Sequence, residues 1–255
     1  MNDNVENEAP IQNEVPPARQ PIFNAPTSVL LTIVLLAVIY AVQSLLLPEG
    51  AVDWLLFNFG LIPLRYATAL SQQGPQLYWT PVTYSLLHGS IQHILFNSLW
   101  LMIFGAPVVR RIGTLRYLLF WILSSVASAA FHLALNWGEN TVLIGASGVI
   151  SGLMGAACRF AFPPSKVRAH PAHRNPRLSI REVFKSRTAV AFIVFWLAGN
   201  LLIALGLPLA GDGDQIVAWD AHIGGFLFGF LLFDLFDVKP RLEDHGSAED
   251  DPLQS

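Results

Sequence analysis

The chain has 255 residues, of which 53% are hydrophobic and only 13% are charged, and its mean hydropathy is positive. This composition excludes an ordinary water-soluble domain and predicts an integral membrane protein. The net charge of −3 gives no indication of a nucleic-acid partner. Because Cys158 is the single cysteine, an intrachain disulfide is also excluded.

Six apolar segments are long enough to be interpreted as membrane spans, because a bilayer core requires about 20 apolar residues per helix. They cover residues 28–47, 81–104, 117–135, 147–162, 188–207 and 218–237. We therefore predict an all-α, polytopic membrane protein with one membrane domain over residues 27–238. The polar stretches 1–26 and 239–255 are expected to be disordered tails.

The basic residues predict the orientation, because Lys and Arg gather in short cytoplasmic loops. The expected loops on the other side of the membrane contain only Arg65, so both termini are expected to be cytoplasmic. The residues on the cytoplasmic side are Arg19, Arg110, Arg111, Arg116, Lys166, Arg168, Arg174, Arg177, Arg181, Lys185, Arg187, Lys239 and Arg241.

Two outer loops are unusual. Residues 48–80 contain the apolar run "VDWLLFNFGLIPLRYATAL", which we expect to form short helices in the membrane interface. The stretch "PLAGDGDQIVAWD" before the sixth span contains Gly211, Asp212 and Gly213, which predict a mobile cap.

Strongly polar side chains inside membrane spans are costly and usually face the protein interior. In this chain they are few, and most of them fall in the second, fourth and sixth spans. They are His88, His93, Asn97, His132, Ser147, Ser151, Asn200 and His222. Taken singly, each has an ordinary explanation: a hydroxyl bonds to its own helix, and a lone imidazole such as that of His132 is as often a packing residue as a functional one.

Helical spacing brings several of these residues to common faces. His93 and Asn97 are four residues apart and share one face of the second span. The small residues of "GASGVISGLMG" and "AHIGGFLFG" let two helix backbones approach closely. We therefore expect the fourth and sixth spans to touch near their outer ends, where Ser147 and His222 both fall.

Together these groups are the parts of a serine hydrolase. A hydroxyl becomes a strong nucleophile when a neutral imidazole accepts its proton, which suits Ser147 and His222. Acyl transfer also needs donors aimed at the developing oxyanion, and the Ser147 N–H at a helix start, Asn97 and His93 are candidates. Asp220 is the only nearby carboxylate, so a Ser/His dyad is expected rather than a triad.

Three motifs, "HILFN" in the second span, "GASG" at the start of the fourth and "AHIGG" in the sixth, resemble those of the rhomboid family of intramembrane serine proteases. The resemblance implies a compact six-helix bundle with a water-filled cavity that opens outward. It also implies cleavage of transmembrane protein substrates in the lipid bilayer near its outer face, without a cofactor or metal, and a location in a bacterial inner membrane.

The resemblance also implies roles for individual residues. Ser147 is similar to the family's nucleophile and His222 to its general base. His93, Asn97 and the Ser147 N–H correspond to the oxyanion hole, and Gly145 to the residue that lets the loop approach the substrate carbonyl. His88 has no chemical role in this comparison and is expected to be structural or to line the cavity.

The chain departs from the family pattern at three places. Many members have Trp-Arg near the end of the first outer loop, where this chain has Trp-Thr at 79–80. The loop after the second span commonly carries Glu-x-Arg, where this chain has Val-Arg-Arg at 109–111. Bacterial members often have a Tyr four residues after the nucleophile, against which the base stacks, and this chain has Ser151 there. The sequence leaves open what orients the His222 ring.

The same residues have three other interpretations. A rhomboid-like protein that binds or escorts membrane proteins without cutting them typically lacks the Ser or the His, and both are present here. A transporter or proton channel with a relay of His88, His93 and His222 predicts paired ionisable groups and often an internal repeat, and neither is visible. A metal site at His88 and His93 has a poor spacing for one helix face and no carboxylate or thiolate partner.

Overall fold

The computed structural model describes residues 25–163, 171–205 and 217–238. The predicted tails 1–26 and 239–255 lie almost wholly outside these residues, as does most of the predicted cap loop. The described part of the chain is all-helical, and its one extended pairing is an isolated bridge between Leu61 and Leu143. The all-α prediction is therefore confirmed.

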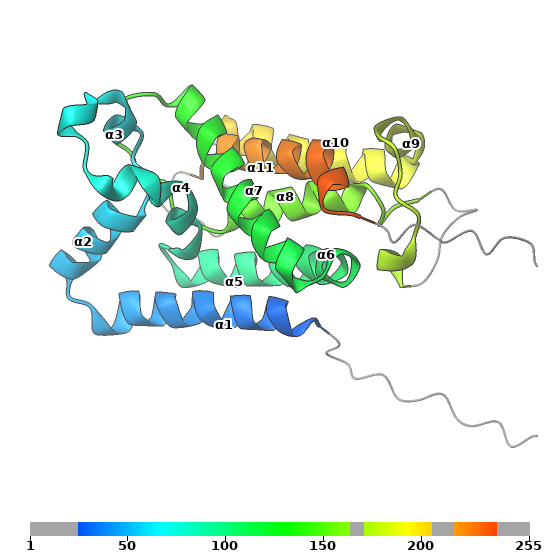
Figure 1. Cartoon of the computed structure of the whole chain (residues 1–255), viewed down its shortest axis with the longest axis horizontal. Coiled ribbons are helices and arrows are strands. Elements are labelled where there is room, and N and C mark those ends of the chain that lie inside the picture. Colours follow the sequence, from blue (N-terminus) through cyan, green and yellow to red (C-terminus); the bar gives the residue numbers. More distant parts are fainter. Residues whose placement is uncertain (1–24, 164–170, 206–216, 239–255) are drawn as a thin grey trace, which may run out of the picture.

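Figure 1 shows the helices in their order along the chain. In chain order they are α1 (Thr27–Ala41), α2 (Glu49–Phe59), α3 (Pro63–Ala67), α4 (Thr80–Thr83), α5 (Ile91–Trp100), α6 (Ala106–Ile112), α7 (Thr114–Leu135), α8 (Ser147–Cys158), α9 (Ile180–Lys185), α10 (Arg187–Ala204) and α11 (Trp219–Leu232). Wider π-helical turns extend α1 over Val42–Leu46 and join α5 to α6 over Leu101–Gly105. Shorter 3₁₀ turns occupy Leu70–Gln72, Pro75–Tyr78, Tyr84–Leu86, Ala172–Arg174 and Phe233–Leu235.

Four stretches of the described chain are long and apolar enough to cross a membrane: Thr27–Leu46, Ile91–Ile112, Thr114–Leu135 and Arg187–Ala204. They correspond to the first, second, third and fifth predicted spans. The fourth and sixth predicted spans are represented by α8 and α11, which have only 12 and 14 residues. The structure thus supports a membrane protein with four helices of spanning length, and a count of six spans is not confirmed.

The second span begins later and ends later than predicted. Residues 81–90 form short helical turns and a loop, and the continuous helix starts at Ile91, because the Ser90 hydroxyl caps it by accepting the His93 N–H at 3.1 Å. At its other end the helix continues to Ile112, so Arg110 and Arg111 lie in α6 rather than in the predicted loop.

The first outer loop contains short helices, as predicted: α2, α3 and two 3₁₀ turns occupy most of residues 48–80. Arg65 is buried there, and it donates to the Phe57 carbonyl at 2.5 Å with its guanidinium 4.8 Å from the centre of the Phe57 ring. The indole of Trp79 donates to the Asn58 carbonyl at 2.7 Å. These contacts join the two halves of the loop region.

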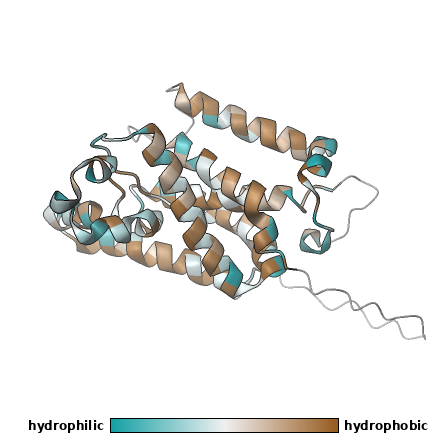
Figure 2. Ribbon diagram, turned by 45° about the horizontal axis from the view of Figure 1, so that its top comes forward, coloured by the Kyte–Doolittle hydropathy of each residue, from teal (hydrophilic) through white to brown (hydrophobic). Residues whose placement is uncertain are grey.

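The core is built around α8, in which every residue from Gly148 to Cys158 is buried. Helix α11 packs directly on α8 through glycines, because a Cβ at Gly225 would overlap the Gly148 carbonyl and one at Gly229 the Gly152 carbonyl. The prediction that the small residues of these two helices let them touch is therefore confirmed. The outer helices are different: α1 and α10 expose many large apolar side chains, as expected for surfaces that face lipid. The ribbons of the helices are mostly brown in Figure 2, the colour of hydrophobic residues.

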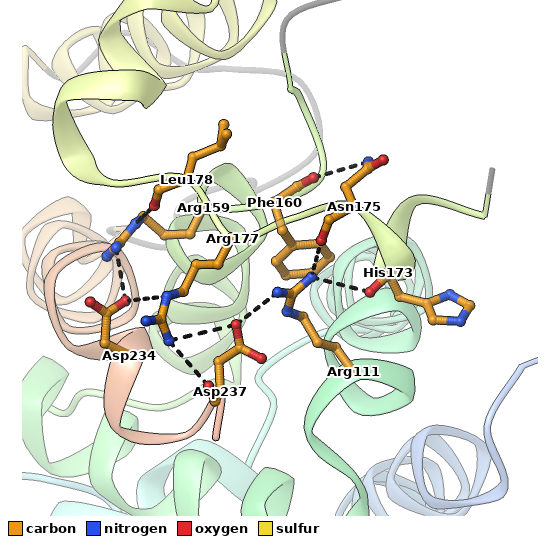
Figure 3. Close-up of polar contacts among 9 residues, drawn as sticks. All are labelled: Arg111, Arg159, Phe160, His173, Asn175, Arg177, Leu178, Asp234 and Asp237. Atoms are coloured by element: carbon orange, nitrogen blue, oxygen red, sulfur yellow. Dashed lines mark hydrogen bonds and ion pairs between the residues drawn. The ribbon is translucent and has the colours of Figure 1, made fainter. Parts of the chain in front are cut away.

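Charged side chains gather at the end of the bundle where α8 and α11 finish (Figure 3). We refer to Arg111, Arg159, Arg177, Asp234 and Asp237 as the Arg–Asp network. Arg111 lies 2.8 Å from the Asp237 carboxylate, Arg159 lies 2.8 Å from that of Asp234, and Arg177 contacts both carboxylates. The network therefore joins α6, the end of α8, the segment before α9 and the end of α11.

Candidate functional site

Ser147 is the first residue of α8, and the loop that leads to it is held at two points. Leu143 pairs with Leu61 through two backbone hydrogen bonds, and the Gly145 N–H donates to the Tyr84 carbonyl at 3.0 Å. Gly145 has φ +117°, a conformation that residues with a side chain rarely adopt. This sharp turn places the Ser147 hydroxyl at the start of α8, where the first backbone N–H groups of the helix have no partner within the helix.

His222 lies in the first turn of α11, and its Nε2 is 2.8 Å from Ser147 Oγ. The glycine contacts between α8 and α11 explain this short distance. They bring the two helix backbones close together, and Ser147 and His222 lie in the first turns of these helices. Both side chains are half-buried rather than sealed. The predicted juxtaposition of hydroxyl and imidazole is present.

His93 and Asn97, both in α5, face the loop before Ser147. A Cβ at Gly145 would lie 2.6 Å from His93 Nε2 and 3.8 Å from Asn97 Nδ2. The missing side chain at Gly145 therefore makes room for the His93 ring as well as permitting the positive φ. The structure thus brings the five predicted site residues to one end of the bundle. They are His93, Asn97, Gly145, Ser147 and His222.

His88 lies just outside this group. It is fully buried, and its ring packs edge-on against that of His93 with 5.0 Å between the ring centres. The Gln43 side chain donates to its backbone carbonyl at 3.0 Å. Within the described residues no group of three or more His, Cys, Asp or Glu side chains is arranged to hold a metal ion. His88 thus has the contacts of a packing residue beside the site.

Asp220, two residues before His222, has its contacts elsewhere. Its carboxylate lies 2.9 Å from His132 Nδ1, accepts from the Asn136 amide and accepts the Ala221 N–H at 2.7 Å. These bonds attach the start of α11 to the end of α7. His132, which the sequence left as either packing or functional, is thus a partner of Asp220.

One contact of His222 was not predicted. Its Nδ1 lies 2.9 Å from Oδ1 of Asn200 in α10. The sequence marks Asn200 as a polar residue in an apolar helix, which is a signal of function, but it does not show which helix that side chain faces. Ser151, which stands where many family members have a stacking Tyr, is buried in α8 one turn after Ser147.

Comparison with known proteins agrees with this geometry. The family model described as "Rhomboid domain" matches residues 75–236, well over half of the chain. The chain is 30% identical over 166 residues to the rhomboid protease GlpG of Pectobacterium atrosepticum. The aligned residues are 64% of this chain and 51% of that protein. It is 28% identical over 154 residues to the rhomboid protease GlpG of Yersinia pestis. Here the aligned residues are 60% of this chain and 46% of the relative. The chain spans about half the length of the curated relatives it matches.

The match includes α5, α8 and α11, the three helices that carry His93 and Asn97, Ser147, and His222. The motifs of the sequence, the pairing of hydroxyl and imidazole in the structure and the family model therefore lead to the same assignment. This chain is a membrane protein that belongs to the rhomboid family.

Proposed function

We propose that this protein is an intramembrane serine protease that cleaves transmembrane segments with a Ser/His dyad. The observation that carries the proposal is the 2.8 Å distance between Ser147 Oγ and His222 Nε2 at the start of a buried helix. The relatives named rhomboid protease GlpG support the same reaction. Both groups are half-buried, so a peptide strand can reach them while much of the surrounding solvent is excluded.

The proposed reaction starts when Ser147 transfers its hydroxyl proton to His222 Nε2 and Oγ attacks the carbonyl carbon of the scissile bond. The carbonyl oxygen becomes an oxyanion, which the Ser147 N–H and the side chains of Asn97 and His93 stabilise. The C–N bond then breaks, and the imidazolium returns the proton to the leaving amine. A water molecule, deprotonated by His222, hydrolyses the acyl-enzyme and restores the Ser147 hydroxyl.

We place the site near the outer face of the membrane, with both termini cytoplasmic. Ser147 begins α8, and the Arg–Asp network surrounds the opposite end of the same helix. Twelve helical residues separate these ends by about 18 Å. Because basic residues favour the cytoplasmic side, the end with Ser147 is assigned to the outer side.

The proposed substrates are single membrane-spanning segments that unwind easily. Inside a helix, the carbonyl of a peptide bond is already hydrogen-bonded and shielded, so Ser147 can attack only an unwound strand. Gly and Pro lower helix propensity by about 1 and 3 kcal/mol relative to Ala. Segments with such residues in their outer part should therefore enter the site more readily.

The test uses the purified full chain, a single-span substrate and a fluorophosphonate probe. We expect the wild-type protein to react with the probe at Ser147 and to cut the substrate near its outer end, as located by mass spectrometry. Ser147→Ala and His222→Ala should each abolish cleavage, because a nucleophile and its base act as a unit. Cleavage by Ser147→Ala at the wild-type rate would disprove the mechanism.

The same experiment separates the proposal from its main alternative. A rhomboid-like protein that escorts membrane proteins without cutting them would bind the substrate and would not react with the probe. A cut near the cytoplasmic end would disprove the assigned orientation, even if Ser147 proved to be the nucleophile.

A further inference from the structure

Helix α10 carries a polar contact to the proposed base that no motif accounts for. Asn200 is the only strongly polar residue among the three buried residues of α10, which are Ala189, Ile193 and Asn200. Its Oδ1 lies 2.9 Å from His222 Nδ1, on the side of the ring opposite to Ser147. Ser147 and Asn200 therefore hold the two nitrogens of one imidazole.

The orientation of the Asn200 amide is determined by a second bond. Its Nδ2 donates to the carbonyl of Trp196, one turn earlier in α10, at 2.9 Å. The oxygen therefore faces His222. Because an amide oxygen only accepts hydrogen bonds, the proton of the neutral His222 ring must be on Nδ1.

This tautomer is the one that base catalysis requires. With the proton on Nδ1, Nε2 carries a lone pair and accepts the hydrogen bond from Ser147, so it can take the hydroxyl proton. The opposite tautomer would point an N–H at Ser147 and could not act as its base. In one serine protease with an Asp as third residue, a substitution that favours the wrong tautomer of the base lowers kcat by about 10⁴-fold.

Packing holds Asn200 in this place. The Trp196 ring stacks on that of Phe226 in α11, with 4.4 Å between the ring centres and 20° between the planes. This stack docks α10 on α11 one turn from the contact between Asn200 and His222. Asp220, the nearest carboxylate in the sequence, is engaged by His132 and Asn136.

From these contacts we infer that Asn200 is a positioning residue, which fixes the orientation and the tautomer of His222 and so keeps the second member of the proposed dyad in its active form. The inference rests on the proposed protease function. It also answers the question raised by Ser151, because a hydrogen bond from α10 orients the ring in the absence of a stacking Tyr on α8.

The test compares two substitutions of Asn200 in the full-length protein. Asn200→Leu keeps the branched shape of the side chain but removes the acceptor, so we expect kcat to fall at least about 10-fold while KM changes little. Asn200→Asp restores an acceptor, so it should recover most of the activity at high pH. Because a carboxylate favours the imidazolium, which is inactive as a base, the acid limb of the pH–rate profile should move to higher pH in this variant.

The other ionisable groups near His222 are the same in the wild-type protein and in the Asn200 variants. They are His88, His93, His132 and Asp220. Ile193→Ala is the matched control, because Ile193 is also buried on α10 but lies two turns away from Asn200. It should lower thermal stability without moving the pH profile.

The outcomes distinguish this inference from the proposed function. If wild type cleaves, Ser147→Ala does not, and Asn200→Leu keeps the wild-type kcat, the protease stands and the role of Asn200 is disproved. Equal losses in Asn200→Leu and Asn200→Asp with an unmoved pH profile would also disprove it, because that pattern indicates a purely structural residue. Absence of cleavage and probe labelling in the wild-type protein would instead disprove the proposed function itself.

Discussion

Asn97 and Asn200 are both buried amides at the candidate site, Asn97 beside Gly145 and Asn200 on His222, but the sequence predicts the place of only the first. Asn97 lies one helical turn after His93, so their common face follows from spacing alone. The contact of Asn200 with His222 joins two helices, α10 and α11, whose contacting residues are 22 positions apart in the sequence. Asn200 is the polar residue of an otherwise apolar helix, so the pattern indicates that it faces inward but not which helix it contacts. The pairing of His222 and Asn200 therefore required the structure.

A substitution of Asn97 tests the proposed oxyanion hole. Asn97→Ala should lower kcat by about 10²-fold to 10³-fold, the usual cost of one oxyanion donor, and should leave KM nearly unchanged. Activity should remain measurable, because the Ser147 N–H is still present. Steady-state kinetics with the single-span substrate provides the measurement.

The control for this substitution is Ser98→Ala. Ser98 is the next residue of α5 and lines an apolar groove between α1 and α5, away from Ser147. It should keep the wild-type kcat. An unchanged turnover number in Asn97→Ala would remove Asn97 from the site.

At the level of whole elements, the sequence predicted most helix starts to within about three residues, but it misplaced the start of the second span. The run from Pro81 to Leu87 is apolar enough to be taken for the start of a span, yet it folds as short turns with Tyr84 and Ser85 buried. The helix starts only after Ser90, whose hydroxyl caps it. Hydropathy averaged over a segment is insensitive to a single capping residue, so the predicted start of the second span was wrong by ten residues.

The packing of α8 on α11 offers a matched pair of substitutions. Gly229→Ala should strongly destabilise the protein, because its Cβ would overlap the Gly152 carbonyl, which belongs to a backbone that cannot move aside cheaply. Gly199→Ala in α10 has no atom within 4 Å of the added Cβ. It should be neutral or stabilising by up to about 1 kcal/mol, because Ala favours helix over Gly.

Thermal unfolding of the two variants in the same detergent measures this difference. Gly229→Ala should lose thermal stability and, with it, the alignment of Ser147 and His222, while Gly199→Ala should retain both. Equal melting temperatures for the two variants would contradict the close contact of α8 with α11.

On the scale of the whole molecule, the candidate catalytic groups and the Arg–Asp network occupy opposite ends of the same two helices. The sequence places Arg111 and Arg177 in connecting loops, where they serve only to indicate orientation, and it places Arg159 inside the predicted fourth span. In the structure Arg111 is buried in α6 and donates to the carbonyls of His173 and Asn175 at 3.1 and 2.6 Å (Figure 3). Such long-range pairs depend on how the helices end in space, so spacing along the chain could not predict them.

This separation predicts that stability and catalysis can be changed independently. Asp237→Ala removes the carboxylate that lies 2.8 Å from Arg111, and both side chains are only 5% exposed. Breaking a buried pair leaves an uncompensated charge, which typically costs about 3–5 kcal/mol. Asp53→Asn in α2 is the control, because Asp53 is exposed and its substitution should change stability by less than about 0.5 kcal/mol.

Equilibrium unfolding in mixed micelles and kcat measured well below the melting temperature together test this prediction. Asp237→Ala should show the lower free energy of unfolding but a kcat close to wild type, because Ser147 and His222 lie at the other end of α8 and α11. A large fall in kcat at a temperature where the variant remains folded would show that the network acts on the catalytic end through these helices. An unfolding free energy equal to that of Asp53→Asn would instead show that the Arg111–Asp237 pair contributes nothing to holding the bundle together.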